Sequence, residues 1–297
     1  MAAPSNIALN NGELSFSAKR CGEGPVVFCL HGFPDNLHTF DAQLPALAAA
    51  GFTAIAPAMR GYEPSSQPQD SDYSVEAMAG DIIAWADELG AERFHLIGHD
   101  WGAAVSYVAG ALYPERIQSL ATLALPHAAN FGDGLKKVPV QSLKSWYITF
   151  FQFPGFAELA TRRNDWALIR KLWRDWSPGY ELSDAEWQQL RDTFNAPGVL
   201  KGMLSYYRQN ASLPKLLGWT DSAMRRLKTV GVPTLALTGS DDGCIDTRLF
   251  DHIMGSDYFP AGVRVERLAG LGHFLHRESP ERVNPLLLDW LGAQSKA

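Results

Sequence analysis

Short apolar runs alternate with segments of helical periodicity along the first 125 residues, and this pattern limits the possible folds more than any other feature of the chain. The run Val26–Leu30 is apolar throughout, as is typical of a strand buried on both faces. Such strands separated by helices predict an α/β fold with a mostly parallel sheet flanked by helices. The expected strands are 7–9, 14–18, 26–30, 52–56, 94–97, 117–125, 234–238 and 263–268, and the expected helices are 41–50, 74–89, 101–113, 247–253 and 280–291.

The alternation stops between residues 128 and 228, where the sequence indicates helices broken by proline and glycine. Residues 128–230 hold 15 lysines and arginines against 9 acidic residues, and 16 of the 33 aromatic residues, although the whole chain has a formal net charge of −6. A block of different composition inside an alternating pattern indicates an insertion. We therefore expect a core domain formed by 1–127 and 229–297 and a helical cap formed by 128–228.

Composition narrows the class of function. A sequence pI near 5.7 gives no support for a nucleic-acid partner, which would require a basic face. Cys21, Cys29 and Cys244 are too few and too scattered for a disulfide framework or a zinc motif, so we expect no metal site. The first residues lack the basic and apolar regions of a signal peptide, and no segment favours a membrane span, so a cytoplasmic protein without a membrane partner is expected.

A turn rich in small residues follows the expected strand 94–97. Residues 98–103 read G-H-D-W-G-A and lead into a helix. Small residues around one central residue allow the tight, strained turn of a nucleophile elbow, which lifts the central side chain clear of the sheet. Here that residue is Asp100, a carboxylate that can attack saturated carbon without a base and form an alkyl-enzyme ester. The alternative is that Asp100 only caps the helix, and the flanking glycines favour the elbow.

A second turn, H-G-F-P at 31–34, directly follows the strand Val26–Leu30. A glycine followed two residues later by proline lets a backbone N–H point back over the end of the sheet, as an oxyanion hole requires. We expect the N–H groups of Phe33 and Trp101 to be its two donors. Their acceptor would be the Asp100 carbonyl oxygen as it becomes anionic during hydrolysis of the ester.

A histidine and a carboxylate follow the last two expected strands. His273 lies in a glycine-bounded loop after the last strand, where it would deprotonate the water that attacks the ester, and His276 is its nearest rival. The loop after the preceding strand reads G-S-D-D-G, and one of its carboxylates would orient the base. Asp242 is the first choice and Asp241 the alternative, since aspartate next to glycine is also common in ordinary turns.

Taken in order, these motifs resemble the α/β-hydrolase superfamily and, within it, the epoxide hydrolases of the soluble, bacterial type. The resemblance covers nearly the whole chain and rests on H-G-F-P at 31–34, R-G-Y at 60–62, G-H-D-W-G at 98–102, the Asp242 turn and G-H-F at 272–274. It implies an α/β-hydrolase fold with an inserted cap, and hydrolysis of an epoxide to a vicinal diol by a catalytic triad with an aspartate nucleophile. No metal or organic cofactor is expected.

The same resemblance implies two cap tyrosines that donate hydrogen bonds to the epoxide oxygen and protonate it as the ring opens. Y-I-T-F-F-Q-F-P-G at 147–155 is similar to the family segment that bears the first, which points to Tyr147. S-Y-Y-R at 205–208 is similar to the segment that bears the second, which points to Tyr207, with Tyr206 as the alternative. A neutral phenol suits this role, because the usual pKa of tyrosine is about 10.

Four aromatic residues close to these motifs indicate the character of the substrate pocket, namely Phe40, Trp101, Phe151 and Phe153. They predict an apolar pocket, so the expected partners are a small apolar epoxide and water. The sequence identifies neither the epoxide nor the ring carbon attacked. It also leaves the choice between a monomer and a homodimer open.

Two other functions compete with this interpretation. A haloalkane dehalogenase shares the Asp-Trp elbow, but it needs a second halide donor that the Phe33 side chain cannot supply, and it has no use for a tyrosine pair. A ligand receptor with this fold would bind without turnover, which the full set of nucleophile, base, acid and tyrosines disfavours. An assay distinguishes the three functions: an epoxide hydrolase releases diol from an epoxide, a dehalogenase releases halide from a haloalkane, and a receptor releases neither.

Overall fold

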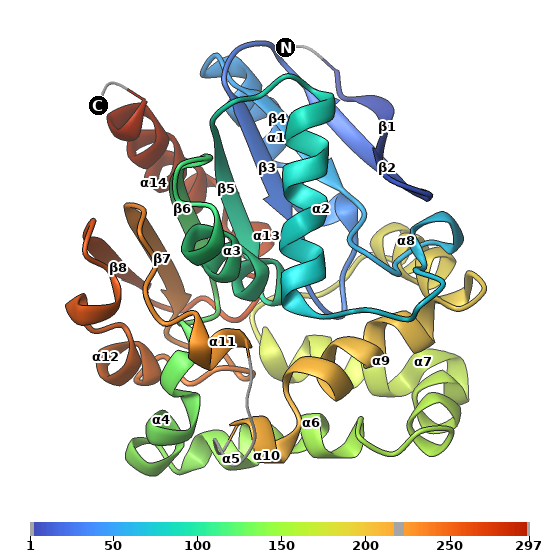
Figure 1. The fold of residues 1–297 in the computed structure, drawn as a ribbon. Helices are drawn as coiled ribbons and strands as arrows, with labels where there is room; N and C mark the ends of the chain where they lie inside the picture. Colours follow the sequence, from blue (N-terminus) through green and yellow to red (C-terminus); the bar gives the residue numbers. More distant parts are fainter. Residues whose placement is uncertain (1–2, 217–222, 296–297) are drawn as a thin grey trace.

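The computed structural model describes residues 3–216 and 223–295, whose strands form one eight-stranded sheet in the order β1-β2-β4-β3-β5-β6-β7-β8 (Figure 1). The pairs β1–β2 and β2–β4 are antiparallel and every other pair is parallel, which confirms the predicted mostly parallel α/β fold. The strands are β1 (Ser5–Asn11), β2 (Leu14–Cys21), β3 (Val26–Leu30), β4 (Thr53–Pro57), β5 (Phe94–His99), β6 (Ile117–Leu123), β7 (Thr234–Gly239) and β8 (Val263–Leu268).

Helices cover both faces of the sheet. On one face α3 (Trp101–Leu112) contacts β5 and β6 and packs beside α2 (Val75–Glu88), and on the other α14 (Pro280–Gln294) contacts β6 and packs beside α1 (Gln43–Ala49). None of the helices in the described residues is long and apolar enough to cross a membrane. The further helices outside the interruption between β6 and β7 are η1 (Leu37–Phe40), η2 (Pro64–Ser66), α12 (Leu249–Ile253), η4 (Ser256–Tyr258) and α13 (Leu275–Glu278).

The predicted strand positions agree with the structure, and one difference matters for the site. Strands β3 and β8 have the predicted bounds, whereas β5 is longer than expected at its carboxyl end. Gly98 and His99 continue the parallel ladder with Thr122 and Leu123 of β6. The rigid sheet therefore extends up to the residue before Asp100.

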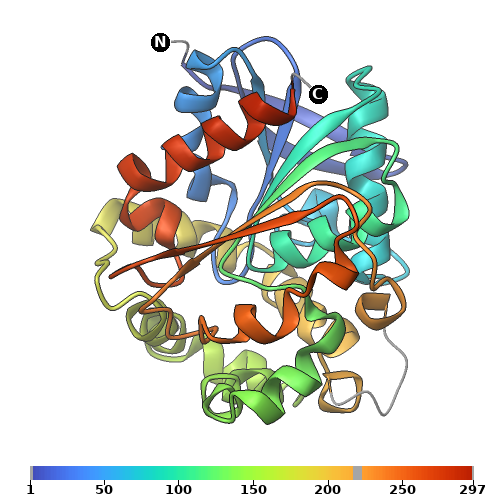
Figure 2. The ribbon, with the colours of Figure 1, turned by 90° about the vertical axis from the view of Figure 1, so that its left-hand side faces the viewer.

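Between β6 and β7 the described residues form helices and no strand. In Figure 1 these helices lie below the carboxyl ends of the parallel strands, and Figure 2 shows the same arrangement from the side. We call residues 128–228 the cap segment. Its helices are η3 (Ala128–Asn130), α4 (Phe131–Lys137), α5 (Val140–Lys144), α6 (Trp146–Phe150), α7 (Phe156–Trp176), α8 (Asp184–Asn195), α9 (Val199–Asn210), α10 (Leu213–Leu216) and α11 (Ala223–Arg226).

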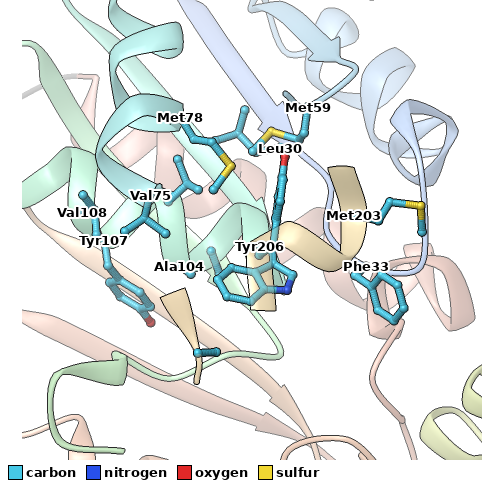
Figure 3. Close-up of a cluster of buried hydrophobic side chains, with 14 of the residues drawn as sticks. Leu30, Phe33, Met59, Val75, Met78, Ala104, Tyr107, Val108, Met203 and Tyr206 are labelled. Carbon is cyan, nitrogen blue, oxygen red and sulfur yellow. The ribbon is translucent and has the colours of Figure 1, made fainter. Parts of the chain in front are cut away.

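Buried apolar side chains form two clusters, one on each face of the sheet. The smaller cluster, which includes Phe40, lies on the face of α1 and α14. The larger lies on the face of α2 and α3 and extends into the cap segment. Figure 3 shows part of it, in which Met203 and Tyr206 of α9 lie among core side chains such as Phe33 and Met59. The cap segment is thus fixed to the core by a shared apolar interior.

Candidate active site

The turn between β5 and α3 presents Asp100 at the carboxyl edge of the sheet. Asp100 has φ 50° and ψ −116°, a strained conformation for a residue with a side chain. A Cβ atom on Gly98 would lie 2.4 Å from the Gly102 carbonyl oxygen, and one on Gly102 would lie 2.1 Å from the carbonyl oxygen of Leu30. Only glycine fits at these two places, so the turn has the geometry of a nucleophile elbow. The Asp100 side chain makes no capping hydrogen bond to α3.

Each oxygen of the Asp100 carboxylate has a different neighbour. Oδ1 accepts a hydrogen bond of 2.8 Å from the backbone N–H of Phe33, in the H-G-F-P turn. Oδ2 lies 3.5 Å from Nε2 of His273. Trp101 is the first residue of α3, where backbone N–H groups have no partner within the helix, so its N–H is the other candidate donor for an oxyanion.

His273 stands between two carboxylates. Its Nδ1 lies 2.9 Å from Oδ2 of Asp242, and Oδ1 of Asp242 accepts the backbone N–H groups of Cys244 and Ile245 at 2.7 and 2.8 Å. Asp241 instead lies at the exposed side of the loop, where it accepts a hydrogen bond from the neighbouring serine. The structure therefore brings Asp242, and not Asp241, next to the histidine.

The surrounding charges set the protonation state of His273. Burial alone would lower the pKa of this side chain, but the negative charges of Asp242 and Asp100 and the hydrogen bond to Asp242 raise it to about 10. This raised pKa favours the protonated form of His273 at neutral pH. The rival base, His276, is buried elsewhere with its Nε2 2.7 Å from the hydroxyl of Thr39.

The cap segment holds the loops that carry this histidine and its acid. The carbonyl of Trp176, at the end of α7, accepts the backbone N–H of His273 at 2.9 Å. Lys144 of α5 donates to the carbonyl of Asp242 at 2.6 Å. The Gln141 side chain makes two hydrogen bonds, of 2.8 and 2.7 Å, with the backbone of the same acid loop. The geometry of the core residues thus depends on contacts with the cap segment.

Tyr147 of α6 and Tyr207 of α9 line the same cavity as Asp100. Their rings lie perpendicular to one another with centroids 5.7 Å apart. The Tyr147 hydroxyl is 3.2 Å from Sγ of Cys244, whereas the buried Tyr207 hydroxyl has no hydrogen-bond partner among the described residues. Burial raises the pKa of both phenols well above the usual 10, and the charge of Asp100 raises it further, so both are neutral donors.

Tyr206, the alternative to Tyr207, points away from this cavity. Its hydroxyl donates a hydrogen bond of 2.6 Å to the carbonyl of Arg60 in the core. The helix approaches this loop closely, since a Cβ atom on Gly202 would lie 2.7 Å from the carbonyl oxygen of Gly61. Tyr206 therefore joins α9 to the core, and Tyr207 is the member of the pair that reaches Asp100.

The cavity beside Asp100 is mainly apolar. Besides Asp100, Trp101 and the two tyrosines, it is lined by aliphatic and aromatic side chains that include Leu125, Phe131, Ile148 and Ile245. Among the lining residues that the structure describes, only Asp100, Trp101, Tyr147 and Tyr207 have polar side-chain atoms. Such a cavity suits an apolar molecule with one polar reacting group.

Three of the four predicted pocket aromatics do not line this cavity. Phe40 is buried in the core cluster on the opposite face of the sheet and stacks on His276, with ring centroids 5.0 Å apart. Phe153 is 56% exposed on the surface of the cap segment, and Phe151 is fully buried behind the tyrosine pair. The structure does not bring these three side chains to the described lining of the cavity, because closeness to a motif in the sequence does not fix the direction of a side chain. Trp101 does line the cavity.

One residue of the site had no motif to indicate it. Cys244 is fully buried, its thiol contacts the Tyr147 hydroxyl, and its backbone N–H donates to Asp242. It therefore lies between the carboxylate that orients the histidine and one of the two phenols. Its position two residues after Asp242 was the only available signal.

The elbow, the histidine–aspartate pair and the sheet order define an α/β hydrolase. The chain belongs to the family described as having the alpha/beta hydrolase fold, whose model matches residues 25–280.

Proteins of known structure and curated relatives that are similar to this chain are named epoxide hydrolases. The crystal structure of a Bacillus megaterium epoxide hydrolase with an inhibitor has a TM-score of 0.84 and 26% identity, over 96% of this chain and 100% of that chain. Epoxide hydrolase A of Mycobacterium tuberculosis is 27% identical over 98% of each protein. Human epoxide hydrolase 4 is 28% identical over 98% of this chain and 79% of that protein. The resemblance to epoxide hydrolases that the motifs indicated is confirmed.

Proposed function

We propose that this protein is an epoxide hydrolase that converts an apolar epoxide into a vicinal diol through a covalent ester on Asp100. The observation that carries the proposal is a buried carboxylate that shares one apolar cavity with two neutral phenols, Tyr147 and Tyr207. Opening an epoxide needs a nucleophile and an acid at the same time, and these groups supply both. The names of the relatives support the same activity.

In the first half-reaction, Oδ2 of Asp100 attacks one ring carbon as the bond from that carbon to the epoxide oxygen breaks. The epoxide oxygen gains charge and takes a proton from Tyr147 or Tyr207. The hydrogen bond from the Phe33 N–H occupies Oδ1, which leaves Oδ2 as the nucleophile. The products are an ester on Asp100, a hydroxyl on the neighbouring carbon and one tyrosinate.

His273 then restores the tyrosine. In the resting site it is protonated, because its pKa is raised to about 10. Esterification removes the negative charge of Asp100, which is one cause of that high pKa, so the pKa of His273 falls when the tyrosinate needs a proton. Transfer of the proton regenerates the phenol and leaves a neutral imidazole, the form that a general base requires.

In the second half-reaction, neutral His273 takes a proton from water as the water oxygen adds to the carbonyl carbon of the ester. The N–H groups of Phe33 and Trp101 stabilise the resulting oxyanion. Collapse breaks the bond between that carbon and the alkyl oxygen, and the remaining acid proton leaves with the diol. The site returns to two carboxylates, an imidazolium and two phenols, and one water has been consumed for each epoxide.

A single turnover in H₂¹⁸O tests the covalent route. With enzyme in excess over an aryl or alkyl epoxide, the first diol should contain no ¹⁸O, and the label should appear in the peptide that contains Asp100. His273→Gln should accumulate the ester, seen as the mass of the substrate on the same peptide, and Asp100→Ala should be inactive. Label in the first diol would show that water attacks the epoxide directly, and diol formation by His273→Gln without added mass on the peptide would argue against the ester.

Substrate panels separate this proposal from the two competing functions. Halide release from a haloalkane without diol formation would indicate a dehalogenase. Binding of an apolar ligand with turnover of neither substrate would indicate a receptor. The two neutral phenols beside Asp100 favour the epoxide, whose oxygen needs donors of this kind.

A further inference from the structure

Cys244 brings a thiol close to Asp100 and His273. One ligating atom from each of these three residues lies within 4.8 Å of the other two, and all three residues are buried. In the part of the chain that the structure describes, this is the only such group of three or more histidine, cysteine and acidic residues. The sequence concealed it, because the three residues follow three different strands, β5, β7 and β8.

The separations suit a single tetrahedral ion. With bonds of about 2.0 Å to nitrogen and oxygen and about 2.3 Å to sulfur, the ligand atoms around zinc lie about 3.3 to 3.5 Å apart. Nε2 of His273 and Oδ2 of Asp100 are already 3.5 Å apart. Binding of the ion would therefore require movement mainly of the Cys244 side chain, to bring its sulfur to the same distance from the other two ligand atoms.

The hydrogen bonding of His273 resembles that of a histidine that binds a metal ion. Its Nδ1 is engaged by the Asp242 carboxylate at 2.9 Å, which directs the lone pair of the neutral ring to Nε2. That Nε2 is completely buried and has no hydrogen-bond partner among the described residues. A carboxylate behind a ligating histidine is the usual support of a zinc site, because it fixes the ring and makes the nitrogen a stronger donor.

We propose that Asp100, Cys244 and His273 form a binding site for a thiophilic divalent cation, with Zn²⁺ the best match. A thiolate, an imidazole and a carboxylate are three ligands that zinc prefers, and they leave a fourth position for water. Binding releases the thiol proton and the Nε2 proton to solvent. The thiolate and the carboxylate then balance the two positive charges of the ion.

Occupation of this site inhibits the enzyme. This consequence rests on the proposed function, because the ion takes the carboxylate oxygen that would attack the epoxide and the nitrogen that would activate water. It also takes the thiol that contacts the Tyr147 hydroxyl. Inhibition by Zn²⁺ should therefore be reversible with a chelator.

Titration of the full-length protein with Co²⁺ tests the site without reference to turnover. We expect a thiolate-to-cobalt charge-transfer band and tetrahedral visible bands that saturate at one ion per chain and disappear when Zn²⁺ is added. Cys244→Ser should abolish the charge-transfer band and weaken binding at least about tenfold, and Asp242→Asn should weaken it about 10- to 100-fold through His273. Cys29→Ala, which removes a buried thiol in β3, should change neither.

Two results overturn the metal site, namely no saturable Co²⁺ binding below about 1 mM, or an unchanged thiolate band in Cys244→Ser. Circular dichroism establishes that each variant is folded. If Cys244→Ser does not fold, the titration is repeated with His273→Gln. An unchanged affinity of that variant for Co²⁺ would also overturn the metal site. If no epoxide is hydrolysed by the metal-free protein, the proposed function fails while the cobalt titration still decides the metal site.

Discussion

Nδ1 of His273 lies 2.9 Å from Oδ2 of Asp242, and the other oxygen of this carboxylate accepts two backbone N–H groups. A carboxylate held on both oxygens cannot turn, so it fixes the plane and the tautomer of the imidazole. Nε2 of His273 is thereby directed at Asp100. This one hydrogen bond determines which nitrogen can serve as base and, for a bound cation, as ligand.

Asp242→Asn should slow hydrolysis of the ester far more than its formation. The variant loses the charge that stabilises the imidazolium and the preference for the correct tautomer, which together contribute on the order of 10⁴-fold in a comparable triad. Rapid-quench measurement should show a burst of ester followed by slow turnover. Asp241→Asn is the matched control, because that side chain is exposed and should leave both phases unchanged. Equal effects of the two variants would argue against a role for Asp242.

Tyr207→Phe and Tyr206→Phe should affect different properties. Loss of the Tyr207 hydroxyl removes an acid from the cavity and should slow ester formation about 100-fold or more. Loss of the Tyr206 hydroxyl leaves the Arg60 carbonyl without its donor, which should lower the free energy of unfolding by about 1 to 3 kcal/mol with near-normal turnover. Single-turnover rates and chemical denaturation measure the two effects. The reverse pattern would make Tyr206 the proton donor.

His273 should make stability fall with rising pH. The folded protein raises the pKa of this group from 6.5 to about 10, so the folded state binds the proton more tightly than the unfolded chain does. The contribution is complete below about pH 6.5 and is lost as the pH rises through about 10. The free energy of unfolding should therefore fall more steeply across this interval in the wild type than in His273→Gln. Identical slopes would mean that the imidazolium is not stabilised by its carboxylates.

Gly102→Ala should damage the elbow. A Cβ atom at this position would meet the Leu30 carbonyl oxygen at 2.1 Å, and a clash with backbone should cost about 2 kcal/mol or more. Gly80→Ala in α2 is the control, because a Cβ atom there has no neighbour within 4 Å and alanine favours a helix by up to about 1 kcal/mol. Thermal unfolding should place the two variants on opposite sides of the wild type. A wild-type melting temperature for Gly102→Ala would show that the turn can relax.

The order of strands and helices could be predicted because each element is specified locally. Strands β3 and β8 are short runs with polar or glycine-containing boundaries, and their bounds agree with the sequence. The end of β5 was harder to predict, since Gly98 and His99 belong to the sheet only through their pairing with β6. A residue that is extended because of its neighbour leaves little signal in its own segment.

The sequence could not determine which of two neighbouring residues belongs to the site. Asp241 and Asp242 follow the same strand, and only the hydrogen bond to His273 distinguishes them. Tyr206 and Tyr207 are adjacent on α9, where successive side chains point about 100° apart, so one reaches the core loop and the other the cavity. Cys244 could not be linked to Asp100 by any spacing, because their proximity arises from the parallel packing of separate strands.

Three residues of the cap segment, Gln141, Lys144 and Trp176, make hydrogen bonds to the loops that carry Asp242 and His273. These bonds link the position of the cap segment, which covers the cavity, to the geometry of the catalytic histidine and its acid. A cap segment that swung away as a rigid lid would break these bonds and release the histidine and its acid together. The assembled histidine and acid therefore require the cap segment in the position that the structure shows. Substitutions that enlarge the cavity beside Asp100 should therefore preserve the histidine and its acid only where they spare Gln141, Lys144 and Trp176.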